Sequence, residues 1–251
     1  MCVLCPLLAV VGLEFLLRPF GLGGYEPVFK EVEETPRGTL VITEQAGSGH
    51  VFFANPGRPG YNDQYAFHHP KPAGTVRIVL VGGSAIKGFP QTRNFAASAF
   101  LREMLSRCWP DRQVEILNLG TTAAASFPVR ELLKQALDYD PDLAVVYAGH
   151  NEFYGAYGVA SINRAGTTPR TVELQYRVQS LALTQGLNAI AHRVKGTQTK
   201  PLMEVMVGQD YVAPESWRRR AAENLLFHHV GSMAGLCRGR DVPVLVCTLP
   251  S

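Results

Sequence analysis

The sequence has little net charge and a single basic run, WRRR at 217–220. Its 24 Lys and Arg residues nearly balance 21 Asp and Glu residues, which leaves a net charge of +3 over 251 residues. Nucleic-acid-binding domains usually carry a pronounced basic patch, so we expect no nucleic-acid partner. The hydrophobic content of 46% is typical of a globular protein with one large domain, alone or with appendages.

Cysteines are few and form no metal-binding pattern. Cys2 and Cys5 make a C-x-x-C pair in an apolar segment, and no second pair completes a zinc site. No cluster of His, Cys and Asp has the spacing of metal ligands. We therefore expect neither a metal nor a cofactor.

No apolar run is as long as a complete membrane span. The longest near the N-terminus, VLCPLLAVVGLEFLL at 3–17, contains Glu14, whereas a spanning helix needs about 20 apolar residues. It also lacks the basic start of a secretory signal. Two interpretations stay open, a surface helix or the tail end of a membrane anchor whose start is missing. We favour a truncated anchor within 1–20, which implies membrane association and a domain outside the cytoplasm.

Residues 21–74 are rich in Gly, Pro and polar residues. Short β-like pieces at 39–43 and 50–55 are separated by turn signals such as NPGRPG. We interpret this region as a connector with a short β lead-in.

From residue 75 onward, strand and helix patterns alternate. Branched apolar runs indicate buried parallel strands, and apolar residues at helical spacing indicate helices. The strands are expected at 76–83, 113–120, 141–149 and 242–250, and the helices at 94–109, 126–139 and about 214–236. Asn94 and Ser126 are the expected N-caps. This alternation predicts an α/β domain over 75–251, with a parallel sheet and helices on both faces.

An insertion at 152–213 separates the third strand from the last helix. It starts with the Gly-rich YGAYGVASINRAG and contains a predicted helix over 170–194. The insertion is too long for a simple crossover, so we interpret it as a lid or a docking surface.

Small and polar residues follow each of the first three predicted strands. They are the GGS ending at Ser84, the segment 118–125, and the GHNE ending at Glu152. In an open α/β sheet, ligands bind outside the carboxyl ends of the strands. We therefore expect the three clusters to form one site.

Ser84, in RIVLVGGSAIKGFP, has three interpretations: a turn residue, a phosphate ligand or a nucleophile. Neither phosphate-loop pattern fits, because Lys87 precedes Gly88 and no G-x-G-x-x-G is present. Ile86 also breaks the G-x-S-x-G nucleophile elbow. A serine at a strand-to-helix turn can direct its hydroxyl and its N–H at one reacting atom. Asn151, an amide donor at the same edge, favours acyl transfer over the turn role.

Three blocks together resemble a known family. VGGSAIKG, NLGTTAAAS and YAGHNEFYG are similar, in order and spacing, to the first three blocks of the SGNH (GDSL-like) hydrolases, in the form found in a membrane-anchored bacterial branch. The resemblance covers about 76–155, and 241–251 more loosely. It implies a flavodoxin-like three-layer α/β/α fold, incomplete here at the C-terminus, and ester hydrolysis through an acyl-serine.

The resemblance also assigns roles to residues. It implies that Ser84 is the nucleophile and that Asn151 and the N–H of Ser84 belong to the oxyanion hole. The family's second-block glycine, a further N–H donor, aligns with Ala123 when Asn118 is the anchor, and Gly120 is the fallback. We expect the Ala123 donor to survive only if its backbone is not left-handed.

The family's base is missing from the chain. It is a histidine three residues after an aspartate, and Asp-x-x-His occurs nowhere in this sequence. We assign no base to His150, His228 or His229, and expect the His–Asp pair beyond residue 251 of a truncated chain. Gly83 also replaces the aspartate of many family members, which removes no reacting group.

The leading hypothesis is a serine esterase or acylhydrolase acting on a small-molecule, lipid or polysaccharide ester. On this hypothesis the fragment alone is inactive, because it lacks the base. The alternative is a non-catalytic module on the same fold that binds a glycan or an acyl group. A phosphate or nucleotide binder fits the glycine turn less well.

Overall fold

The computed structural model describes residues 4–44, 63–161, 166–195 and 211–247. Its main sheet consists of β4 (Thr75–Gly82), β5 (Gln113–Asn118), β6 (Leu143–Tyr147) and β7 (Val244–Val246). All neighbouring strands are parallel, in the order β5-β4-β6-β7. In chain order this is second, first, third, fourth, which is the flavodoxin-like arrangement. The predicted α/β class is confirmed.

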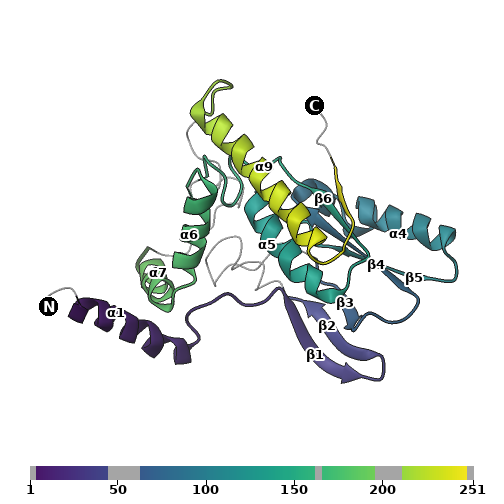
Figure 1. The fold of residues 1–251 in the computed structure, drawn as a ribbon, viewed down its shortest axis with the longest axis horizontal. Helices are drawn as coiled ribbons and strands as arrows, with labels where there is room; N and C mark the ends of the chain where they lie inside the picture. The colour runs from purple at the N-terminus through teal and green to yellow at the C-terminus, as the bar shows by residue number, and fades with distance from the viewer. Residues whose placement is uncertain (1–3, 45–62, 162–165, 196–210, 248–251) are drawn as a thin grey trace.

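Helices cover both faces of this sheet (Figure 1). Val79 and Val81 of β4 belong to the core that includes α5 (Ser126–Ala136) and α9 (Trp217–Arg238). Ile78 and Leu80 point to the opposite face, where α4 (Ala97–Cys108) packs. Side chains of a strand alternate between faces, so a strand with apolar residues on both faces must be covered on both sides. The three-layer architecture is therefore as predicted.

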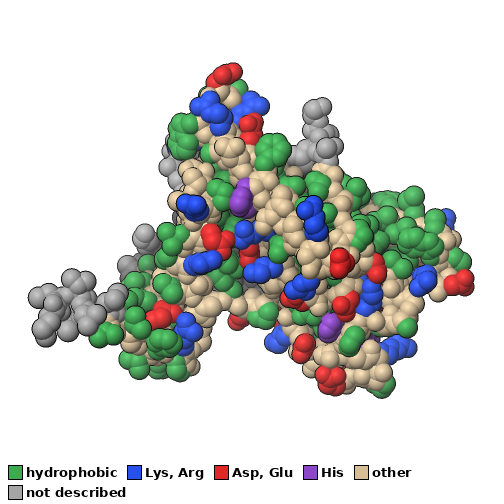
Figure 2. Space-filling model, in the orientation of Figure 1, with side chains coloured by type: hydrophobic (Ala, Val, Ile, Leu, Met, Phe, Trp, Pro, Cys, Tyr) green, Lys and Arg blue, Asp and Glu red, His purple; other side chains and the backbone are tan. Residues whose placement is uncertain are grey.

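The outer face of α4 stays apolar. Phe100 and Met104 are exposed there, as is Trp109 just beyond the helix. Figure 2 shows hydrophobic side chains gathered over this end of the molecule, whereas charges of both signs mix over the face formed by α5, α6 and α9.

Both predicted N-caps are wrong. Asn94 lies in the 3-10 turn η2 (Arg93–Phe95), and α4 begins after Ala96. Ser126 is the first residue of α5 rather than its cap, and its side chain bonds to Glu152 and His229. The N-cap is Ala125, which makes no side-chain capping bond.

A smaller antiparallel sheet precedes the main one. It consists of β1 (Phe29–Thr35), β2 (Gly38–Thr43) and β3 (Ala66–His69), in that order. The strand expected at 39–43 is confirmed as β2, and the piece expected at 50–55 lies outside the described residues. Phe29 and Phe67 pack on Tyr139 of the 3-10 turn η3 (Leu137–Tyr139), with ring centroids 4.7 and 5.4 Å away. The division of the chain near residue 75 stays a prediction.

The insertion contains two helices where one was expected over 170–194. They are α6 (Pro169–Gln179) and α7 (Ala182–Lys195). The break follows from capping: Glu14 of α1 (Leu4–Leu17) accepts hydrogen bonds from the N–H groups of Ala182 and Leu183, at 2.9 and 3.0 Å. A carboxylate at a new helix N-terminus stabilises the start of α7 there.

Helix α1 lies beside α7, away from the main sheet (Figure 1). It has 14 residues, and within the described part of the chain no helix is both long and apolar enough to cross a bilayer. The membrane anchor stays a prediction.

Candidate active site

Ser84 begins α3 (Ser84–Lys87) directly after β4 and Gly83. The two glycines before it are needed because β6 and its loop lie too close for a side chain. A Cβ on Gly82 would lie 2.0 Å from the Tyr147 carbonyl oxygen, and one on Gly83 would lie 2.8 Å from Nδ2 of Asn151. Ser84 is half-buried, and its hydroxyl has no hydrogen-bond partner among the described residues.

The Asn151 side chain joins the clusters at the three strand ends. Its amide lies against Gly83 of the first cluster and donates to the carbonyl of Ala124, in the second cluster, at 3.1 Å. The second amide hydrogen has no acceptor among the described residues. The structure thus brings the Ser84 turn, the 118–125 segment and the Asn151 loop to one edge of the sheet.

Asn118 holds the Ser84 turn against the end of β5. Its buried Nδ2 donates to the Ile86 carbonyl at 2.8 Å and to Ser98 Oγ at 3.0 Å. Its Oδ1 accepts a hydrogen bond from the N–H of Gly120 at 3.0 Å. That N–H is therefore already bonded, which weighs against Gly120 as the fallback donor.

Ala123 has a left-handed backbone, with φ of +59°. The condition set from the sequence, that this backbone not be left-handed, is not met. The condition was also misplaced, since an alanine in this conformation directs its N–H as a glycine would. The Cβ costs about 1–2 kcal/mol without changing that direction. The Ala123 N–H has no acceptor among the described residues, and its carbonyl accepts from the N–H of Ala156 at 2.7 Å.

No described histidine forms a hydrogen bond with Ser84. His150 is exposed, with its ring 5.3 Å from that of Tyr147. His229 is buried, and its Nδ1 lies 2.8 Å from Ser126 Oγ. Among the described residues, no hydrogen bond identifies a base for Ser84.

A buried polar network that the sequence did not reveal lies beneath the Asn151 loop. Glu152 Oε1 accepts from the N–H of Ser126 at 2.7 Å, and Oε2 accepts from its hydroxyl at 2.8 Å. Because the Ser126 hydroxyl donates its hydrogen bond to Glu152, its Oγ can accept a hydrogen bond from Nδ1–H of His229. The three residues are at most 4% exposed, so Ser126 is too buried to act as a nucleophile. The sequence signal was only the glutamate after Asn151.

Burial shifts both titrating groups of this network. Loss of solvation raises the pKa of Glu152 to about 7, against the hydrogen bonds from Ser126, which lower it. Loss of solvation also lowers the pKa of His229 to about 3, and the Arg130 charge adds to this. Both groups therefore resist ionisation in the folded protein.

These shifts predict opposite pH effects on stability. Folded Glu152 holds its proton up to about pH 7, whereas the unfolded chain releases it near 4.5, so stability falls by about 3 kcal/mol as the pH rises between these values. In the unfolded chain His229 becomes protonated below about pH 6.5, whereas in the folded protein it stays neutral down to about pH 3. Stability therefore also falls as the pH drops from about 6.5 to about 3. Urea unfolding at pH 3–9 should show a plateau at about pH 4.5–6.5. Glu152→Gln should turn this plateau into a rise of stability with pH, because only the His229 contribution remains, and an unchanged profile in that variant would contradict the assignment.

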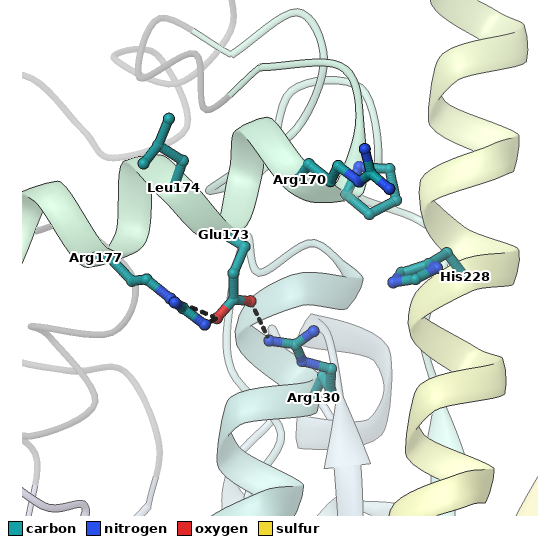
Figure 3. Close-up of a pocket in the computed structure, with 7 residues that line it drawn as sticks. Arg130, Arg170, Glu173, Leu174, Arg177 and His228 are labelled. Atoms are coloured by element: carbon teal, nitrogen blue, oxygen red, sulfur yellow. Dashed lines mark hydrogen bonds and ion pairs between the residues drawn. The ribbon is translucent and has the colours of Figure 1, made fainter.

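A separate cavity of about 370 Å³ lies between α6, α9 and α5 (Figure 3). It is lined by Arg130, Pro169, Arg170, Glu173, Leu174, Arg177 and His228. Glu173 accepts from Arg130 at 2.8 Å and from Arg177 at 3.5 Å, which offsets part of the positive charge. Neither Ser84 nor Asn151 lines this cavity. Among the described residues no group of three His, Cys, Asp or Glu side chains could hold a metal ion.

Solved structures of two esterases and of a lipase/acylhydrolase are similar to this chain. One is AlinE4, an SGNH-hydrolase family esterase, at 17% identity over 64% of this chain and 96% of that chain, with a TM-score of 0.28. A lipase/acylhydrolase from Enterococcus faecalis is 20% identical over 67% of this chain and 74% of that one, with a TM-score of 0.29. The acetyl xylan esterase AlAXEase is 12% identical over 68% and 77%, with a TM-score of 0.34. No protein-family model matches the chain, and no curated protein matches it.

Proposed function

We propose that this protein is a serine esterase of the SGNH type in which Ser84 is the nucleophile. The main support for the proposal is the position of the Asn151 side-chain amide. It lies next to Gly83 and donates a hydrogen bond to the Ala124 carbonyl. This puts one side-chain donor next to the Ser84 turn and next to Ala123, whose N–H has no described acceptor. Such a set of preorganised donors is what a developing oxyanion requires.

In the proposed reaction, Ser84 Oγ attacks the carbonyl carbon of an ester and a base removes the hydroxyl proton. The carbonyl oxygen becomes negatively charged and accepts hydrogen bonds from the N–H groups of Ser84 and Ala123 and from Asn151 Nδ2. Collapse expels the alcohol, which takes the proton from the base, and water then hydrolyses the acyl-serine. We propose that the base is a histidine oriented by an aspartate. The substrate is a small-molecule, lipid or polysaccharide ester.

Covalent labelling tests the proposal. The full-length protein should react with a fluorophosphonate probe, and mass spectrometry should place the adduct on the peptide that contains Ser84. Ser84→Ala should abolish labelling, whereas Ser106→Ala, which removes an exposed serine of α4, should leave it unchanged. Absence of label on Ser84 in folded, full-length protein would sink the proposal.

A further inference from the structure

The two segments that carry Asn151 and Ala123 are fastened together by backbone bonds. Ala156 donates its N–H to the Ala123 carbonyl at 2.7 Å, and Ala125 donates to the Ala156 carbonyl at 3.3 Å, around a parallel bridge between Ala124 and Ala156. Ala123 is held here in a left-handed conformation. A strained residue of this kind persists only where its surroundings fix it.

The Glu152 side chain connects the same two segments through side-chain hydrogen bonds. Both its oxygens bond to Ser126, at 2.7 and 2.8 Å, and hydrogen bonds to an ionised group are stronger than neutral ones. Glu152 directly follows Asn151, and Ser126 lies three residues after Ala123. Above about pH 7, where Glu152 is ionised, a shift of either segment would therefore break a charge-assisted contact buried away from water.

The same carboxylate replaces a local cap on α5. The N-cap residue, Ala125, offers no side-chain acceptor, and the acceptor instead comes from Glu152, 26 residues away in sequence. A nearby Ser, Thr or Asp would satisfy the helix N-terminus equally well. A capping group from the Asn151 loop does more, because it ties the loop to the helix. His229 of α9 forms a further hydrogen bond with Ser126, at 2.8 Å between Nδ1 and Oγ.

We propose that Glu152 is a positioning residue, whose bonds to Ser126 hold the Asn151 amide and the Ala123 N–H at the separation that the oxyanion needs. The inference rests on the proposed function. It assigns Glu152 no contact with substrate, and its effect on the reaction passes through Asn151 and Ala123. Donors displaced by about 1 Å cost on the order of 10²-fold in rate, so a loosened loop should lower kcat and leave substrate binding nearly intact.

A double-mutant cycle with Asn151 tests this inference. Ester hydrolysis by the full-length protein is measured at pH 8, where the Glu152 carboxylate is mostly ionised. Glu152→Ala should lower kcat by roughly 10- to 100-fold with KM changed by less than about 3-fold, and Glu152→Gln, which keeps the shape, should recover part of the loss. In an Asn151→Ala background, Glu152→Ala should cost much less, because the donor that it positions is already absent. A merely structural role would give additive losses.

Controls separate the possible failures. Glu131→Gln alters another buried carboxylate of α5, one that pairs with Arg130 and not with the loop, and should leave kcat within about 3-fold. Full kcat in Glu152→Ala, or additivity in the cycle, would overturn the inference. If Glu152→Ala does not fold, Glu152→Gln takes its place in the double-mutant cycle with Asn151→Ala. Full kcat in Glu152→Gln, or additive losses in that cycle, would then overturn the inference. Activity that survives Ser84→Ala would instead overturn the proposed function itself.

Discussion

Replacing Asn151 with alanine should lower kcat for ester hydrolysis by about 10²- to 10³-fold, the usual effect of removing one oxyanion-hole donor. One amide hydrogen of Asn151 is occupied by the Ala124 carbonyl at 3.1 Å, which fixes the side chain and leaves the other hydrogen for the substrate. The bond to the oxyanion strengthens only as charge develops, so KM should change little. Steady-state kinetics of the full-length protein measure both constants.

The neighbouring residue provides a matched control for Asn151. His150 is exposed, and its described contact is with the ring of Tyr147. His150→Ala should leave kcat within about 3-fold, because the side chain is exposed and none of its described contacts involves Ser84, Ala123 or Asn151. Unfolding curves should show that Asn151→Ala costs only about 1 kcal/mol, for the lost hydrogen bond to Ala124. Wild-type kcat in Asn151→Ala would remove Asn151 from the oxyanion site.

Arg77→Met should lower the free energy of unfolding by about 3–5 kcal/mol. Arg77 lies in β4 with no exposed surface. Its guanidinium binds Glu115 Oε2 at 2.8 Å, the Tyr139 carbonyl at 2.6 Å and the His68 carbonyl at 2.7 Å. It also lies 4.5 Å from the centroid of the Phe67 ring. One side chain thus joins the small sheet to the main sheet, and its loss leaves a carboxylate and two carbonyls without their partner.

Urea unfolding measures the Arg77 effect. Arg107→Met is the control, because Arg107 pairs with Glu103 on the exposed surface of α4 at 2.9 Å, and such pairs contribute at most about 0.5 kcal/mol. Adding Glu115→Leu to Arg77→Met should recover part of the loss, because it removes a partly buried charge that has lost its ion-pair partner. A loss below about 1 kcal/mol in Arg77→Met would show that the two sheets are held together by other contacts.

The sequence predicted the parts of this fold that depend on local pattern. The apolar run ending at Gly82 had to be a strand buried on both faces, and the strands that end at Asn118 and Tyr147 followed the same logic. Because parallel strands end at one edge, the meeting of Ser84, Ala123 and Asn151 was expected from their places after those strands.

The sequence could not predict contacts made across large separations. Serine is a residue type preferred at helix N-caps, which is why Ser126 was predicted to be one. Its hydroxyl instead bonds to Glu152 and to His229, which is 103 residues away. Glu14 likewise caps the N-terminus of α7 from a segment 168 residues away in sequence. The strand β1, with charged residues along most of its length, carries no apolar signal beyond Phe29 and Val32. In each case a tertiary partner decides what local propensity leaves open.

The central claim is that donors from three strand ends serve one oxyanion formed at Ser84. The most direct test is a crystal structure of the full-length protein after reaction with a phosphonate inhibitor. The account predicts a phosphorus bonded to Ser84 Oγ, with one phosphonyl oxygen about 2.7–3.1 Å from the N–H nitrogens of Ser84 and Ala123 and from Asn151 Nδ2. An adduct on Ser84 whose oxygens all face solvent, or an adduct on another residue, would contradict it.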